Sequence, residues 1–96
     1  MLQEITIRTG NAEALKPLVR AAMEREVKLL EYSVQRTRDA LHVFEQRFSM
    51  KTEEFERKFA SREIEESLDY IDWWMETEAL HYLESQLQSM REAQLD

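Results

Sequence analysis

The sequence predicts an all-α protein in which two long helices form an α-hairpin, are joined by a short helix, and dimerise into a coiled-coil-like helical bundle. Three observations lead to this prediction. The single glycine and the single proline, Gly10 and Pro17, both lie in the first fifth of the chain. Apolar residues over 23–48 recur at alternating steps of four and three, which is a heptad pattern. Similar steps recur over residues 64–90.

The length of the chain is the reason to expect dimerisation. Its 96 residues form at most one domain, 1–96, and a chain this short cannot bury a large core by itself. A hairpin alone covers one apolar stripe on each of its helices. Pairing two hairpins into a four-helix assembly would cover the rest.

The first half of the chain is predicted to hold an N-terminal arm, residues 1–11, and one long helix. Ile5 and Ile7 in the arm give a weak strand signal, so the arm either pairs with a copy of itself or stays frayed. Pro17 suits the first turn of a helix, and the long helix is therefore expected over 17–48. Its heptad seam, predicted to face the oligomer and with Thr37 as its single polar member, consists of Met23, Val27, Leu30, Val34, Leu41, Phe44 and Phe48.

The second half is predicted to hold a short helix over 52–60 and a long helix over 62–93. Thr52 is a good cap for the short helix, and Ser61 is a candidate cap for the long one. The sequence leaves open whether residues 52–93 form one helix or two. The apolar face of the last helix is predicted to run through Ile64, Leu68, Ile71 and Met75, and then through Leu80, Leu83, Leu87 and Met90.

Charge is spread unevenly along the chain, whose net charge is −7. Residues 63–84 contain eight acids and no Lys or Arg. Such a segment repels nucleic acid, so no nucleic-acid partner is supported, and it attracts a basic protein surface. The alternative meaning of the acids is a solvated helix face.

Aromatic residues share this acidic segment. On a helical wheel, Tyr70 and Trp73 point away from the predicted apolar face, and Trp and Tyr are enriched among interface hot spots. The alternative is that the short helix folds over these rings. We interpret the segment as a partner-binding surface made of Glu65, Asp69, Tyr70, Asp72, Trp73, Trp74 and Glu76.

No catalytic motif is found, so we expect neither an enzyme nor a cofactor. The absence of cysteine excludes disulfides and thiolate metal sites. Glu78 and His81 match the Glu-x-x-His spacing of di-iron carboxylate bundles, but the wheel turns His81 outward, so a metal site stays only an alternative. The chain has no apolar run of membrane-spanning length and no signal-peptide pattern, so no membrane partner and a cytoplasmic location are expected.

Two motifs suggest a family. The stretch Phe-Ser-Met-Lys-Thr-Glu-Glu-Phe-Glu-Arg-Lys-Phe over residues 48–59, followed by Asp-Tyr-Ile-Asp-Trp-Trp-Met-Glu over 69–76, resembles small charged helical proteins encoded beside toxin genes in bacteria and archaea. The resemblance covers roughly residues 15–90, and Ser49 stands where the pattern often has Gly.

The resemblance implies an antitoxin, a helical protein that binds and neutralises a basic ribonuclease-type toxin by masking it. An acidic helix that carries aromatic side chains is compatible with that role. Two other hypotheses remain open at this point. One is a homo-oligomeric helical scaffold, and the other is a dimeric, ferritin-like di-iron carboxylate protein.

Overall fold

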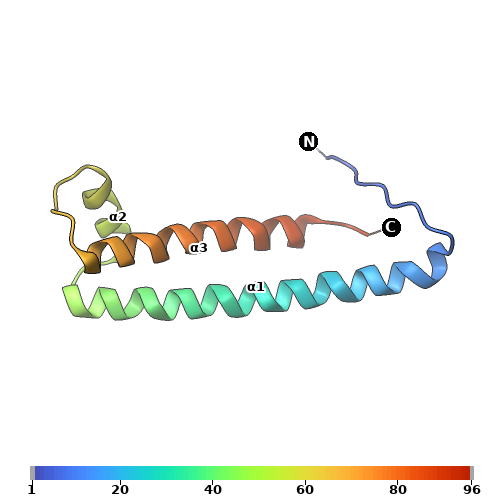
Figure 1. Cartoon of the computed structure of the whole chain (residues 1–96), viewed down its shortest axis with the longest axis horizontal. Coiled ribbons are helices and arrows are strands. Elements are labelled where there is room, and N and C mark those ends of the chain that lie inside the picture. Colours follow the sequence, from blue (N-terminus) through green and yellow to red (C-terminus); the bar gives the residue numbers. More distant parts are fainter. Residues whose placement is uncertain (1, 96) are drawn as a thin grey trace.

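The computed structural model describes residues 2–95 and confirms the all-α fold (Figure 1). Its three helices are α1 (Ala12–Phe48), α2 (Thr52–Ala60) and α3 (Leu68–Glu92), and no strand occurs within the described residues. The long helices α1 and α3 lie side by side and antiparallel, and α2 lies at the end of the hairpin where α1 ends. None of these helices is long and apolar enough to span a membrane.

Helix α1 begins five residues earlier than predicted because Asn11, rather than Pro17, sets its start. The Asn11 side chain accepts a hydrogen bond from the Ala14 N–H at 3.2 Å, which is an ordinary N-cap. Pro17 lies inside the helix, near its N-terminal end. The helix ends at Phe48, and the left-handed backbone of the C-cap Ser49 (φ 51°) lets the Met50 N–H donate to the Glu45 carbonyl at 3.2 Å.

The arm that precedes α1 adopts no regular structure. Residues 2–11 form neither helix nor strand, and Ile5 and Ile7 are exposed. The weak alternation of this segment therefore does not produce a strand within one chain. Met1 of the predicted arm lies outside the described residues.

The chain between Thr52 and Glu92 forms two helices, which answers the question that the sequence left open. Helix α2 ends at Ala60, and α3 begins at Leu68 rather than at residue 62. The cap of α3 is Ser67, whose hydroxyl accepts a hydrogen bond from the Tyr70 N–H at 3.1 Å. The segment 61–67 is therefore a loop.

The predicted seam of α1 does form one apolar face, but that face packs inside the chain. Leu30, Val34 and Leu41 are buried against α3 and α2 within the single chain, so covering them requires no second copy. Thr37 is buried as well, and its hydroxyl donates to the Ser33 carbonyl at 2.9 Å.

Helix α3 uses the predicted face in its second half but not in its first. Leu87 is buried with Leu80, Leu83 and Met90 packed beside it, as predicted. In the first half Trp73 and Thr77 are buried, whereas the predicted residues Leu68, Ile71 and Met75 are exposed. Apolar residues line two sides of this helix, and the wheel alone does not choose between them. The large Trp73 ring fills the space where the three helices meet, which explains why its side turns inward.

Candidate functional site

The aromatic residues of all three helices converge around Trp73. Its indole ring is fully buried and stacks on Phe55 of α2, with ring centres 3.9 Å apart and planes 2° apart. Phe44 and Phe48 of α1 stack on it at 5.6 and 5.8 Å. Stacked aromatic rings contribute beyond the apolar area that they bury. This cluster therefore joins the three helices at the loop end of the hairpin.

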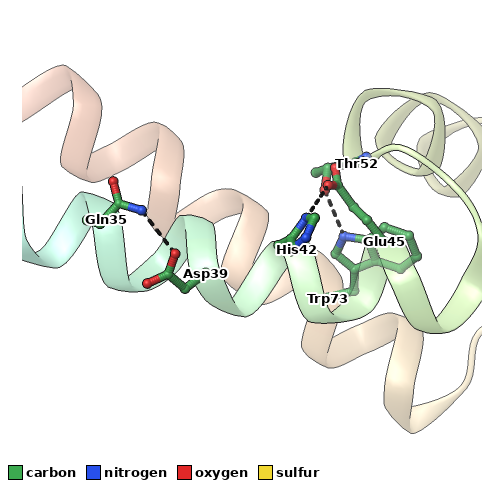
Figure 2. Close-up of polar contacts among 6 residues, drawn as sticks. All are labelled: Gln35, Asp39, His42, Glu45, Thr52 and Trp73. Atoms are coloured by element: carbon green, nitrogen blue, oxygen red, sulfur yellow. Dashed lines mark hydrogen bonds and ion pairs between the residues drawn. The ribbon is translucent and has the colours of Figure 1, made fainter.

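A polar chain runs beside the cluster (Figure 2). The Trp73 Nε1–H donates to the Thr52 hydroxyl oxygen at 3.2 Å, and the Thr52 backbone N–H donates to the Glu45 carboxylate at 2.8 Å. Each of these three residues comes from a different helix. The indole can be buried at little cost because its N–H has a hydrogen-bond acceptor. Glu45 in turn accepts a hydrogen bond from an otherwise unpaired N–H in the first turn of α2.

The position of Glu45 changes the pKa of its carboxyl group. Burial by itself would raise its pKa, but hydrogen bonds from the Thr52 backbone and side chain outweigh burial, aided by the nearby Lys51 charge. The pKa of Glu45 is therefore lower than its usual value, and the group is ionised where it caps α2. The lowered pKa of Glu45 has a structural origin, because the hydrogen bonds from Thr52 that lower it also hold α2 on the hairpin.

The prediction that the Trp73 ring faces a partner is wrong for the folded chain. The wheel placed this ring away from the core, yet it has no exposed surface. The alternative, that the short helix folds over the rings, is the arrangement observed: Phe59 of α2 contacts Trp74 at 5.2 Å, and Phe55 contacts Tyr70 at 5.7 Å. Tyr70 and Trp74 are half-buried by these contacts.

The four predicted acids have different surroundings. Asp69 accepts two hydrogen bonds from the Arg47 guanidinium, at 3.1 and 3.0 Å, and so helps to hold α3 on α1. Glu65 and Asp72 are exposed, Glu76 is half-buried, and none of these three makes an ion pair within the described residues. The acids available to a partner are therefore those other than Asp69.

Glu78 and His81 do not come together as a metal site would require. Glu78 is exposed, and His81 instead places its Nε2 2.7 Å from the Glu56 carboxylate of α2. His42 lies 3.7 Å from Glu45. Within residues 2–95, no group of three or more potential metal ligands is close enough to hold an ion.

The loop before α3 carries exposed acidic residues close in the chain to an exposed apolar residue. Glu65 and Glu66 are exposed there, and Leu68 at the start of α3 is 82% exposed. Glu63, in the same loop, is exposed too but lies 3.5 Å from the Arg57 guanidinium. We call Glu65, Glu66 and Leu68 the acidic end. Sequence reasoning placed Leu68 in the core, and only the capping of α3 by Ser67 indicates otherwise.

Comparison with known proteins identifies no relative: no family model matches the chain, and no curated protein or solved structure matches it significantly. The resemblance to antitoxins therefore depends on the two quoted motifs alone.

Proposed function

We propose that this chain is a protein-binding module without catalytic activity, and that its acidic end captures a basic protein. The observation that supports this proposal is the pair Glu65 and Glu66, which are exposed, unpaired within the described residues, and next to an exposed leucine. Carboxylates of this kind speed the encounter with a cationic surface, and the leucine supplies apolar contact once the complex has formed.

The resemblance to antitoxins suggests which basic protein. A ribonuclease-type toxin presents a cationic RNA-binding surface, and an acidic helical partner can mask it. In this proposal the rings of Trp73 and Phe55 hold the helices together and do not touch the toxin. We therefore assign toxin binding to the acidic end and not to those rings.

The test uses the product of a neighbouring gene that encodes a small basic protein. We expect this protein to bind the wild-type chain and to lose RNA cleavage on binding. The double variant Glu65→Lys, Glu66→Lys should associate roughly ten-fold or more slowly at low salt, and the difference should shrink as salt screens the charges.

A matched control keeps the change in net charge the same. Glu24→Lys with Glu92→Lys alters two exposed acids at the opposite end of the hairpin. It should slow association much less. Equal slowing by both double variants would mean that net charge, and not the acidic end, attracts the partner. A basic neighbour that fails to bind the wild-type chain would contradict the antitoxin role.

We also propose that the chain self-associates, as its heptads predict. Its accessible surface is 8039 Å², whereas a compact monomer of 11.6 kDa exposes about 5,800 Å². Its radius of gyration is 18.7 Å, against about 12.5 Å for a compact domain of this length. Surface in such excess favours burial against a second copy, and it also supports the scaffold hypothesis.

A further inference from the structure

The arm that precedes α1 has backbone groups and apolar side chains without partners inside the chain. Within residues 2–95, no backbone N–H or carbonyl of residues 2–10 takes part in a hydrogen bond. Ile5 is 94% exposed and Ile7 is 58% exposed. A segment with free backbone groups and exposed β-branched residues is suited to pair with another strand.

The order of side chains in the arm suits pairing with an identical arm. Residues 4–8 read Glu-Ile-Thr-Ile-Arg, with Thr6 at the centre. In an antiparallel pair centred on Thr6, position 4 lies opposite position 8 of the other strand, and position 5 lies opposite position 7. Glu4 therefore meets Arg8, Ile5 meets Ile7, and Thr6 meets its own copy. Opposite charges and threonine pairs stabilise neighbouring strands, and isoleucine suits a pleated surface.

The two charged residues of this pattern are available for such a contact. Glu4 and Arg8 are exposed, and neither forms an ion pair within the described residues. A parallel pair of arms in register would set each charge against its own copy. An antiparallel pair shifted by one residue would set an isoleucine against Glu4 or Arg8. The register centred on Thr6 is therefore the one that pairs the charges and the isoleucines together.

Pairing in this register gathers the isoleucines on one face of the ribbon. Side chains alternate between the two faces of a strand, so Ile5 and Ile7 of both arms share one face. A ribbon of two strands is only marginally stable by itself, and this face needs a helix to pack on. The chain bends at Gly10, and the arm runs back from the start of α1 in the direction of α3 (Figure 1).

The first turns of α1 provide such a surface. Arg91 in the last turn of α3 pairs with Glu31, so about the first four turns of α1 lie beyond the end of α3. Leu15, Val19 and Met23 continue the inner face of α1 through these turns and are only half-buried. Four helical turns span about 22 Å, which matches the roughly 23 Å of seven paired strand residues.

We infer that the arms of two copies of this chain pair as an antiparallel β-ribbon centred on Thr6, and that this ribbon joins the copies into a dimer. A two-fold axis through the centre of the ribbon relates the two chains, so each favourable pair occurs twice. The inference rests on the proposed self-association and adds the segment and the register through which it occurs. The acidic end lies at the other end of the hairpin and stays free for the basic partner.

The chain contains no cysteine, so single cysteine substitutions report the register. Under mild oxidation, Thr6→Cys should form a disulfide-linked dimer at least ten-fold faster than Gln3→Cys. Directly opposite residues of antiparallel strands have Cα atoms about 4.5–5.5 Å apart, within the range of a disulfide. Two copies of position 3 would instead lie about 20 Å apart along the ribbon. A mixture of Gln3→Cys with Thr9→Cys should cross-link rapidly, because these positions lie opposite each other.

Charge variants test the same register without a covalent bond. Glu4→Arg and Arg8→Glu each set like charges opposite each other, so each variant should dimerise several-fold more weakly than the wild-type chain in sedimentation at low salt. An equimolar mixture of the two variants restores opposite charges at both positions and should dimerise as the wild-type chain does. Glu24→Arg and Lys28→Glu alter exposed residues of α1 with the same spacing. These control variants should leave dimerisation unchanged, alone or mixed.

The outcomes separate self-association from this ribbon. A wild-type chain that sediments as a monomer at about 100 µM would overturn both. A wild-type dimer in which Thr6→Cys and Gln3→Cys cross-link at equal rates, or which both arm charge variants leave unchanged, would overturn the ribbon alone. Protection of the arm from proteolysis only when the basic partner is present would assign the arm to that partner and overturn the ribbon too. Circular dichroism is the folding control, since the arm lies outside the helices.

Discussion

The loop end of the hairpin buries its core residues more completely than the middle of the hairpin does. At the loop end, three helices enclose Trp73 and Phe55, which have no exposed surface at all. In the middle, only α1 and α3 meet, and Leu30, Val34 and Leu87 keep 6–8% of their surface exposed. Beyond the end of α3, the first turns of α1 have no helix beside them (Figure 1).

This difference shows what a third helix does in a small protein. Two helices can cover one stripe on each other, but their remaining apolar residues stay at the surface. Where α2 covers one side, the apolar side chains there are buried or half-buried; where no helix covers the other side, Leu29, Tyr32 and Met75 remain exposed.

The largest expected effect comes from removing the centre of the loop end. Trp73→Ala should lower the free energy of unfolding by about 3–5 kcal/mol, because it leaves a cavity among three helices. Leu87→Ala, in the two-helix middle, should cost less, about 2–3 kcal/mol, since the site can collapse or admit solvent. Urea denaturation followed by circular dichroism measures both. Equal losses would mean that the two regions are equally well packed.

A smaller effect concerns the charge that holds α2 in place. Glu45→Gln removes the carboxylate from the first turn of α2 and should cost about 1 kcal/mol at pH 7. Because the pKa of Glu45 is lower in the folded chain than in the unfolded chain, its ionised form stabilises the fold. This contribution is complete above the usual glutamate pKa, about 4.3, and is lost as the pH falls through the lowered value.

The difference in unfolding free energy between the wild-type chain and Glu45→Gln should therefore be greatest at neutral pH and disappear in acid. Comparing the two proteins by urea denaturation from pH 7 to pH 3 tests this. A difference that persists unchanged at pH 3 would mean that the shape of the side chain, and not its charge, supports α2.

The smallest expected effect concerns an ion pair between α1 and α3 in the middle region. The Arg38–Glu84 pair measures 2.9 Å, but its side chains are 55% and 42% exposed. Arg38→Ala should change stability by no more than about 0.5 kcal/mol, and salt should remove the difference. A loss as large as that of Leu87→Ala would show that ion pairs, and not apolar contacts, hold the two-helix region together.

Features that depend on neighbours in the sequence were predictable. The heptad of α1 identifies its inner face correctly, because its steps of four and three place Leu30, Val34 and Leu41 on one side of the helix, and these residues are buried. The short helix 52–60 was predicted with its observed bounds, although Lys51, and not the predicted Thr52, is its N-cap. The start of α1 was misplaced because Asn11 competes with Pro17 as a local signal, and the cap prevails.

The orientation of α3 and the burial of Trp73 were decided only by tertiary structure. In the first half of α3, one side carries Leu68, Ile71 and Met75 and the other carries Tyr70, Trp73 and Trp74, so periodicity cannot rank the two sides. The choice depends on Phe55, which α2 brings against the indole, and on Thr52, which accepts the indole N–H. These contacts join residues that are about twenty positions apart in the chain, and no local pattern encodes them. Caps and periodicity act over one or two turns, so local patterns are enough to predict a helical chain and the face of α1 that turns inward. Which side of α3 is buried near the loop end followed from the fit of one large ring among three helices.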